Sequence, residues 1–152
     1  MQRDESVKRE ENIKKILFVC SGNTCRSPMA EGIFNSAAAE KNLDFIAQSA
    51  GIGAISGAPY STNAVLACMD IGIDISKGRS KNLRDLNVSD YCLFVPMTCG
   101  HARALAAQGI DRDKIILLKS DGISDPYGGN LQMYRDCRDE IKQAVKMLIE
   151  KL

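Results

Sequence analysis

The sequence predicts a single α/β domain in which a twisted, four-stranded parallel sheet carries helices on both faces. Short apolar runs alternate along the chain with segments whose apolar residues recur at helical spacing. This alternation favours a parallel sheet, because each intervening helix returns the chain to the edge from which the next strand starts. The length of 152 residues, 45% of them hydrophobic and 26% charged, suits one domain with its own core.

The individual elements follow from local patterns. Compact apolar runs predict four strands, at residues 13–20, 45–49, 91–95 and 114–118. Apolar periodicity, capping residues and glycine stops predict four helices and one helical turn. The helices are expected at residues 28–41, between Ser61 and Gly72, at 98–108 and from 131 to the end, and the turn at 81–86. Loops that follow the strands should share the carboxyl edge of the sheet, where ligands bind in such folds.

The charge distribution and the cysteines limit the partners and the compartment. Residues 1–13 are expected to be a charged extension before a domain of residues 14–152, without the apolar centre of a signal peptide. A net charge of +1 with scattered basic residues predicts neither a nucleic-acid nor a membrane partner. Six cysteines without a secretion signal indicate a reducing, cytoplasmic setting. Three of them are expected to be small core or helix residues: Cys68, Cys92 and Cys137.

Residues 20–27, which follow the first predicted strand, carry the strongest chemical signal. They read Cys-Ser-Gly-Asn-Thr-Cys-Arg-Ser, and Pro28 follows, at a position suited to the start of a helix. Gly22 and Asn23 can adopt the left-handed backbone that turns N–H groups inward, and a helix N-terminus adds a partial positive charge. Arg26 contributes a planar fork that matches two phosphate oxygens. We therefore expect this segment, called the 20–27 loop below, to bind a phosphate-like anion.

A cysteine at the first position of such a loop is placed to attack the bound anion. The thiolate is the nucleophilic form of cysteine, and the loop charges together with a hydroxyl from Ser27 would stabilise it on Cys20. Ser27 could also cap the helix. The competing interpretation is a metal site at Cys20 and Cys25, but this pair lacks the usual zinc spacing and a matching second pair. Neither nucleotide-binding glycine motif is present, so no metal or cofactor is predicted.

A second candidate lies in the polar loop of residues 119–130, which follows the last predicted strand. Asp125, held extended by Pro126, could donate a proton to a leaving group at the same sheet edge, and Tyr127 could form a wall beside it. Their ordinary interpretations are a turn aspartate and a surface aromatic residue. No catalytic role is predicted for His101, the only histidine.

The two motifs together resemble the low-molecular-weight protein tyrosine phosphatases. That family carries a Cys-x5-Arg-Ser loop near its N-terminus, here at Cys20, Arg26 and Ser27, and an Asp-Pro-aromatic motif late in the chain, here at Asp125 and Tyr127. The resemblance covers roughly residue 14 to the end. It implies a phosphorylated protein substrate, a phosphocysteine intermediate and an inorganic phosphate or other oxyanion in the loop.

The resemblance also implies the role of each site residue. Cys20 would be the nucleophile and Asp125 the general acid and base. Asn23 would brace the loop, Ser27 would stabilise the thiolate, and Cys25 would form a protective disulfide with Cys20 on oxidation. The phosphoryl group would be held by Arg26 and the loop residues Ser21, Gly22, Asn23, Thr24 and Cys25.

Two departures from the tyrosine-specific pattern concern the substrate. Position 24 is Thr where tyrosine-specific members carry a bulkier aliphatic residue, and Gly128 and Gly129 follow the Asp-Pro-aromatic motif. Both features are similar to a bacterial branch that removes phosphate from arginine. Residues 52–58 also lack the aromatic residue that usually forms one wall of a phosphotyrosine slot. Within the family, these features favour phosphoarginine.

Two other functions remain open at the level of sequence. A related branch reduces arsenate through a cysteine relay coupled to thioredoxin, and Cys92 and Cys99 have suggestive spacing. Cys92, however, falls inside a predicted strand, whereas a relay cysteine should lie on a mobile exposed loop. The second alternative is a module that binds phosphorylated ligands without catalysis.

Overall fold

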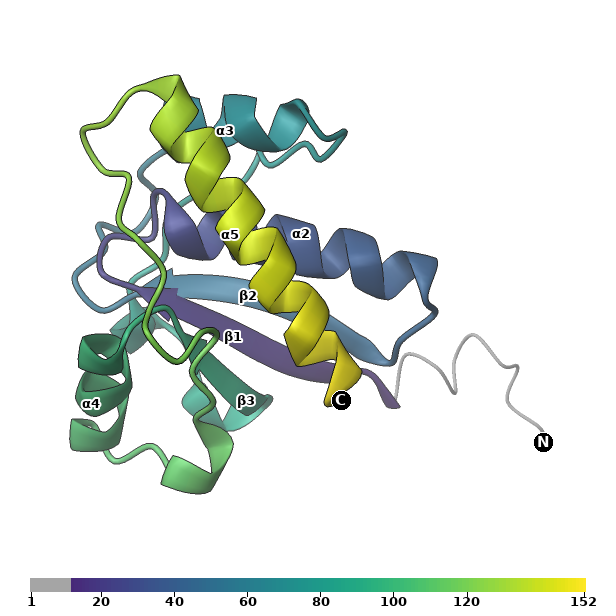
Figure 1. The fold of residues 1–152 in the computed structure, drawn as a ribbon. Helices are drawn as coiled ribbons and strands as arrows, with labels where there is room; N and C mark the ends of the chain where they lie inside the picture. The colour runs from purple at the N-terminus through teal and green to yellow at the C-terminus, as the bar shows by residue number, and fades with distance from the viewer. Residues whose placement is uncertain (1–11) are drawn as a thin grey trace.

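A computed structural model describes residues 12–152 and places a three-stranded parallel sheet at the centre of the fold (Figure 1). The strand order is β2-β1-β3, with β1 at Lys14–Cys20, β2 at Phe45–Gly51 and β3 at Tyr91–Pro96. In this register Phe18 of β1 lies between a residue of β2 and a residue of β3. The last five residues of β1 are buried, as expected for the central strand of a sheet covered on both faces.

The prediction of a fourth strand at residues 114–118 is wrong. This segment makes one isolated bridge, between Phe94 and Ile115, although the Ile116 and Leu118 N–H groups donate to carbonyls of β3. The reason is the short 3-10 helix at Arg112–Lys114, which uses the N–H groups of Lys114 and Ile115 for its own turn. The chain therefore follows the edge of β3 without forming a continuous ladder.

Helices lie on both faces of the sheet, as predicted. They are α2 (Arg26–Glu40), α3 (Thr62–Met69), α4 (Cys99–Ala107) and α5 (Leu131–Glu150). The long α5 crosses α2 and contacts α3 on one face, whereas α4 packs against β3 on the other (Figure 1). The predicted turn at 81–86 contains a 3-10 helix at Leu83–Asp85, and another spans Val88–Asp90.

Strand β1 divides the core into two clusters. Its alternate residues point to opposite faces, so Ile16 and Phe18 join the cluster beneath α2 and α5, and Leu17 and Val19 join the one beneath α4. On the larger side the Phe18 and Phe34 rings meet edge to face with centroids 5.8 Å apart. Cys68 and Cys137 are buried there, as predicted.

Two local predictions differ from the structure. Helix α2 begins at Arg26 rather than Pro28, because the first turn closes through the Met29 N–H and the Cys25 carbonyl. Pro28 is tolerated in that turn, where no N–H is required. Cys92 is exposed rather than a core residue, since it lies at the start of β3, beside an irregularity in the register with β1.

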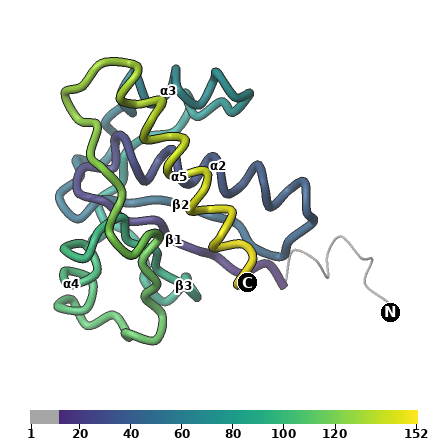
Figure 2. The backbone as a smooth tube through the Cα atoms, viewed as in Figure 1, coloured from purple at the N-terminus to yellow at the C-terminus, as the bar shows by residue number. Residues whose placement is uncertain are grey.

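The carboxyl ends of the strands bring the two predicted site segments together. The 20–27 loop follows β1, and the 119–130 loop passes beside it before α5 begins (Figure 2). None of the helices within residues 12–152 is long and apolar enough to cross a membrane. The predicted N-terminal extension, apart from residues 12 and 13, lies outside the described residues.

Candidate active site

The 20–27 loop is shaped by a left-handed backbone at one position. Asn23 has a φ of 52°, whereas Gly22, for which the same freedom was expected, does not have a positive φ. Within residues 12–152, no protein acceptor pairs with the backbone N–H groups of Gly22, Thr24 and Cys25. Unpaired donors around one turn form the kind of concave site that binds an oxyanion.

The Cys20 thiol lies in this turn and is in contact with two polar groups, the Ser27 hydroxyl and the Asn23 backbone N–H. Its Sγ is 2.8 Å from Ser27 Oγ and accepts a hydrogen bond from the Asn23 backbone N–H at 3.2 Å. Because the Asn23 side-chain amide donates to the same Ser27 oxygen, the hydrogen of the Ser27 hydroxyl is free to point at the sulfur. Only 3% of Cys20 is exposed, so these polar groups surround a sulfur that is shielded from most solvent. Ser27 does not cap α2; Cys25 occupies the N-cap position, without a side-chain hydrogen bond.

The fully buried side chain of Asn23 holds the loop against the rest of the domain. Its Nδ2 also donates to Ser49 Oγ at 3.0 Å, and its Oδ1 accepts from the Lys81 backbone N–H at 2.8 Å. Its own carbonyl accepts from the Ser80 hydroxyl. One asparagine thus connects the loop to β2 and to residues nearly 60 positions later in the chain.

Behind this asparagine lies Glu31, which sequence reasoning missed. Ser49 Oγ donates to Glu31 Oε1 at 2.9 Å, and burial raises the pKa of this carboxyl above its usual range, with the Ser49 hydrogen bond opposing the shift. Glu31 lies near the N-terminus of α2, where acidic residues are common because they interact favourably with the helix dipole. Its position in the sequence therefore does not indicate a role in the site. Only its contact with β2 shows that it completes a polar chain that ends at the loop.

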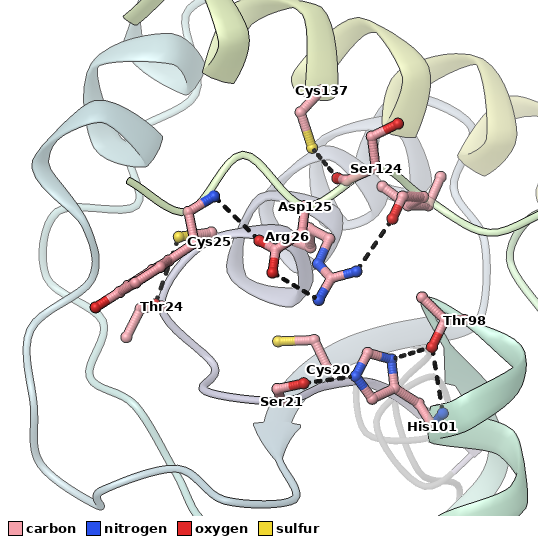
Figure 3. Close-up of polar contacts among 12 residues, drawn as sticks. Cys20, Ser21, Thr24, Cys25, Arg26, Thr98, His101, Ser124, Asp125 and Cys137 are labelled. Carbon is pink, nitrogen blue, oxygen red and sulfur yellow. Dashed lines mark hydrogen bonds and ion pairs between the residues drawn. The ribbon is translucent and has the colours of Figure 1, made fainter. Parts of the chain in front are cut away.

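Arg26 and Asp125 face each other across the site (Figure 3). Arg26 is largely buried, and one of its nitrogens donates to the Ile123 carbonyl at 3.0 Å. A second nitrogen lies 3.5 Å from Asp125 Oδ2. This distance exceeds that of a close charge-assisted hydrogen bond, and 55% of the Asp125 side chain is exposed. The guanidinium is therefore fixed. The carboxyl is held at Oδ1 by the Tyr127 backbone N–H at 3.1 Å, and its Oδ2 remains available to a ligand.

These residues line one pocket of about 400 Å³ at the carboxyl edge of the sheet. Its floor includes Cys20, Ser21 and Arg26, and its rim includes Ile55, Asp125 and Tyr127. Ile55 and Tyr127 are each 78% exposed, the highest values among the large apolar side chains that the structure describes. An exposed apolar rim around a polar floor is typical of a site that binds a larger molecule. Tyr60, the first aromatic residue after the 52–58 segment, is buried and does not reach this pocket.

Thr24 and Cys25 form the side of the pocket that faces α5. Thr24 Oγ1 is 3.4 Å from Cys25 Sγ, which in turn is 3.2 Å from the Tyr134 hydroxyl. Burial raises the pKa of Tyr134 to about 12, and the hydrogen bond with Cys25 adds to this shift, so the phenol stays protonated. Among residues 12–152, no group of three His, Cys, Asp or Glu side chains is arranged to hold a metal ion.

His101 also reaches the site, although no role was predicted for it. It belongs to the first turn of α4, and its Nε2 lies 2.8 Å from Ser21 Oγ (Figure 3). Burial lowers the pKa of His101 below its usual range, the Arg26 charge lowers it further, and Asp125 opposes the shift. Sequence reasoning could not detect this contact, because 80 positions separate the two residues.

Comparison with known proteins identifies the class of protein. Residues 15–152 match the family described as low molecular weight phosphotyrosine protein phosphatase. The chain is accordingly a cysteine-dependent phosphatase. It belongs to the low-molecular-weight phosphotyrosine protein phosphatase family.

Relatives and solved structures agree with this assignment. A protein-arginine-phosphatase of Bacillus subtilis is 36% identical over 144 residues, which cover 90% of this chain and 95% of the relative. A glutaredoxin arsenate reductase of Synechocystis is 30% identical over 140 residues, or 92% of this chain and 99% of the relative.

Among solved structures, a low molecular weight protein tyrosine phosphatase from T. tengcongensis superimposes with a TM-score of 0.87. It is 40% identical, with 91% of this chain and 99% of that chain covered. A cysteine-to-serine mutant of the arginine phosphatase YwlE, described as carrying a phosphorylated active-site serine, gives a TM-score of 0.86 at 33% identity, covering 91% and 95% of the two chains.

Proposed function

We propose that this phosphatase hydrolyses phosphoarginine in proteins, with phosphotyrosine as the competing substrate, through a phosphocysteine intermediate. The observation that carries the proposal is the meeting of Cys20, Arg26 and Asp125 at a single pocket. The serine-phosphorylated mutant of YwlE supports a phosphoryl group carried at this loop position in a relative. Inorganic phosphate, the product, would occupy the same pocket.

In the first step the Cys20 thiolate attacks phosphorus, and the bond to the leaving nitrogen or oxygen breaks. Arg26 and the unpaired N–H groups of the loop would hold the equatorial oxygens, whose charge is the main feature to be stabilised in such a transfer. Asp125, at the pocket rim, would give its proton to the leaving group. Ser27 would release its hydrogen bond to the sulfur as the negative charge leaves it.

In the second step water attacks the phosphocysteine. Asp125, now a carboxylate, would accept a proton from this water as the oxygen bonds to phosphorus and the phosphorus–sulfur bond breaks. Cys20 leaves as a thiolate, stabilised again by the Asn23 N–H and the Ser27 hydroxyl. The cycle then ends with the release of inorganic phosphate.

Two features of the pocket support phosphoarginine as the preferred substrate. The Thr24 side chain lines the pocket and presents a hydroxyl, which suits a polar guanidinium better than an aromatic ring. Within the described part of the chain, the pocket lining contains no aromatic residue other than Tyr127, and Ala54, Ile55 and Ala58 are aliphatic, so a phenyl ring has no second aromatic surface to stack on. The protein-arginine-phosphatase of B. subtilis is 36% identical to this chain, whereas a probable low molecular weight protein-tyrosine-phosphatase of Ralstonia solanacearum is 31% identical over the same number of residues.

A comparison of two phosphopeptides tests the proposal. Hydrolysis of phosphoarginine and phosphotyrosine peptides is measured for the parent and for Thr24→Ile, with Cys20→Ser as the inactive control. We expect the parent to prefer phosphoarginine and Thr24→Ile to shift the ratio toward phosphotyrosine. An unchanged ratio would contradict the role of Thr24, and residual hydrolysis by Cys20→Ser would contradict a cysteine nucleophile. A parent that binds phosphate but hydrolyses neither peptide would indicate a non-catalytic binding module.

We also propose Cys25 as the redox partner of Cys20, since both residues line the pocket. Peroxide would oxidise the Cys20 thiolate to a sulfenic acid, and attack by Cys25 would form the disulfide with loss of water. A reducing, cytoplasmic setting would keep this pair in the thiol form found here.

The geometry disfavours arsenate reduction through Cys92. This thiol is exposed near the amino end of β3, whereas the active site lies at the carboxyl end, about 13 Å away for the four residue steps from Cys92 to Pro96. Cys99, at the first residue of α4, lies nearer the site. We expect Cys92→Ser to retain full phosphatase activity; thioredoxin-dependent arsenate reduction that is lost in this variant would favour the alternative.

A further inference from the structure

We propose that His101 is a positioning residue of the 20–27 loop, which donates a hydrogen bond to Ser21 and so turns the Ser21 hydroxyl hydrogen into the anion pocket. The inference deepens the proposed function, because it assigns His101 a part in binding the phosphoryl group. It rests on three groups from two segments: Ser21 in the loop, and Thr98 and His101 at the start of α4.

The three groups form a continuous chain of contacts. The His101 backbone N–H donates to Thr98 Oγ1 at 3.3 Å, Thr98 Oγ1 lies 3.0 Å from His101 Nδ1, and His101 Nε2 lies 2.8 Å from Ser21 Oγ (Figure 3). His101 is only 7% exposed, so its ring has little access to water that could replace these contacts. Ser21, in contrast, is exposed and is one of the residues that line the pocket.

The direction of each hydrogen follows from counting donors and acceptors. A neutral imidazole carries one N–H, either at Nδ1 or at Nε2. Thr98 Oγ1 already accepts the backbone N–H of His101, so its own hydrogen is best used toward Nδ1. We therefore assign the ring hydrogen to Nε2, from which it donates to Ser21 Oγ. The Ser21 hydroxyl then has no acceptor in His101, so its hydrogen can be donated to an anion bound in the pocket.

The opposite tautomer of His101, with its hydrogen at Nδ1, would weaken anion binding. With the hydrogen at Nδ1, the Ser21 hydroxyl would donate to Nε2 and present only lone pairs to the pocket. A phosphoryl group has only acceptor oxygens, so it would be repelled by that arrangement and favoured by the first one. The lowered pKa of His101 is consistent with a neutral ring, as both arrangements require. Helix α4 thus orients a loop hydroxyl from the face of the sheet opposite α2.

Two variants of His101 separate a positioning role from a structural one. His101→Gln keeps an N–H donor near the position of Nε2, whereas His101→Phe keeps a ring without any donor. Affinity for inorganic phosphate is measured as competitive inhibition of p-nitrophenyl phosphate hydrolysis and, independently, by calorimetry. We expect His101→Phe to weaken phosphate binding about tenfold, the usual value of one hydrogen bond to a charged group, and His101→Gln to stay within about threefold of the parent. Equal losses in both variants, or none in either, would overturn the proposal.

The Ser21→Ala background tests whether His101 acts through Ser21. We expect the double variant Ser21→Ala/His101→Phe to bind phosphate no more weakly than Ser21→Ala alone, because the group that His101 orients is already absent. Additive losses would show that His101 acts by another route. Unfolding midpoints measured alongside would identify a variant that has merely lost stability.

A measurement on the unaltered protein covers the case in which His101→Phe does not fold. Nitrogen–proton NMR correlations of the single imidazole distinguish the two neutral tautomers directly. We expect the hydrogen at Nε2, and a hydrogen at Nδ1 would overturn the assignment. Both this spectrum and the phosphate calorimetry remain informative if the parent hydrolyses no phosphopeptide, so failure of the proposed function is distinguishable from failure of the role of His101.

Discussion

At the scale of single residues, the site combines a buried thiol with an exposed acid. Cys20 is surrounded by donors that belong to the same loop, so its environment does not depend on the ligand. Asp125 is mostly exposed, and its ion pair with Arg26 is of the kind that contributes at most about 1 kcal/mol in water. The carboxyl can therefore leave the guanidinium at little cost when a phosphoryl group takes its place.

This difference leads to a prediction for Asp125→Asn. We expect turnover to fall about 10²–10⁴-fold for substrates with poor leaving groups, because an amide cannot supply the proton that the leaving atom needs. The loss should be much smaller for p-nitrophenyl phosphate, whose leaving group is stable as an anion. Steady-state rates for phenyl and p-nitrophenyl phosphate measure both.

Asp121→Asn is the matched control for this experiment. Asp121 lies in the same 119–130 loop and is exposed, but it pairs with Lys119 rather than with Arg26. We expect no change in the leaving-group dependence. Equal losses for both substrates in Asp125→Asn would mean that this residue affects binding or folding and is not the acid.

At the scale of elements, β2 limits how the 20–27 loop can be built. Gly51 pairs with Cys20 at the end of β2, and the following N–H groups donate to the carbonyls of Cys20 and Ser21. A Cβ at position 51 would lie 2.5 Å from the Ser21 carbonyl oxygen and 2.8 Å from the Asn23 nitrogen. Both are backbone atoms, so the loop cannot avoid the clash by rotating a side chain.

We therefore expect Gly51→Ala to weaken phosphate binding at least about tenfold, because displacing the loop removes at least one hydrogen bond to the anion. The measurement is the inhibition constant of inorganic phosphate. At Gly53 the same Ser21 oxygen would be 3.9 Å from an added Cβ, an ordinary contact, so Gly53→Ala should have almost no effect on this constant. Similar effects of the two substitutions would contradict the close fit between β2 and the loop.

How much of the fold and of the site could be predicted from the sequence depends on how far apart in the chain the contacting residues lie. The apolar run of β1 followed by Cys20 and Arg26 is local, so it predicted the strand, the loop and the helix start to within two residues. Hydrogen bonds between distant residues were out of reach: Asn23 with Lys81, and Ser21 with His101, are 58 and 80 positions apart. Periodicity reports which face of an element is buried, but not which buried polar groups meet.

The prediction of a fourth strand was wrong for a related physical reason. An apolar run at residues 114–118 predicts burial, and Leu118 is in fact buried. A ladder also needs free N–H groups in register, and the 3-10 turn at Arg112–Lys114 uses the first of them. Composition alone does not show that competition.

At the scale of the whole molecule, the site depends on both halves of the core. Helix α2 supplies Arg26 and the Glu31 chain from one face of the sheet, and α4 supplies His101 from the other. Two ionisable groups on these helices, Glu31 and His101, have opposite effects on the pH dependence of stability. Burial disfavours the charged form of each, which means the protonated form of His101 and the deprotonated form of Glu31.

The pH dependence of global unfolding should show both effects. The folded-state pKa of His101 lies below its ordinary value of 6.5, so the unfolded chain binds the proton more readily. Stability from this residue is present above pH 6.5 and is lost as the pH falls through the folded pKa. The folded-state pKa of Glu31 lies above its ordinary value of 4.5, so its contribution is present below pH 4.5 and is lost as the pH rises through the folded pKa.

Urea unfolding of the parent, His101→Gln and Glu31→Gln between pH 4.5 and 8 separates the two contributions. Because His101 is the only histidine, the rise in unfolding free energy on approaching pH 6.5 should disappear in His101→Gln. Glu31→Gln keeps an oxygen that accepts from Ser49 and removes the opposing fall, so its rise toward neutral pH should be steeper than that of the parent. A His101→Gln curve parallel to that of the parent would show that the imidazole titrates alike in the folded and unfolded chains, and that α4 does not hold it neutral.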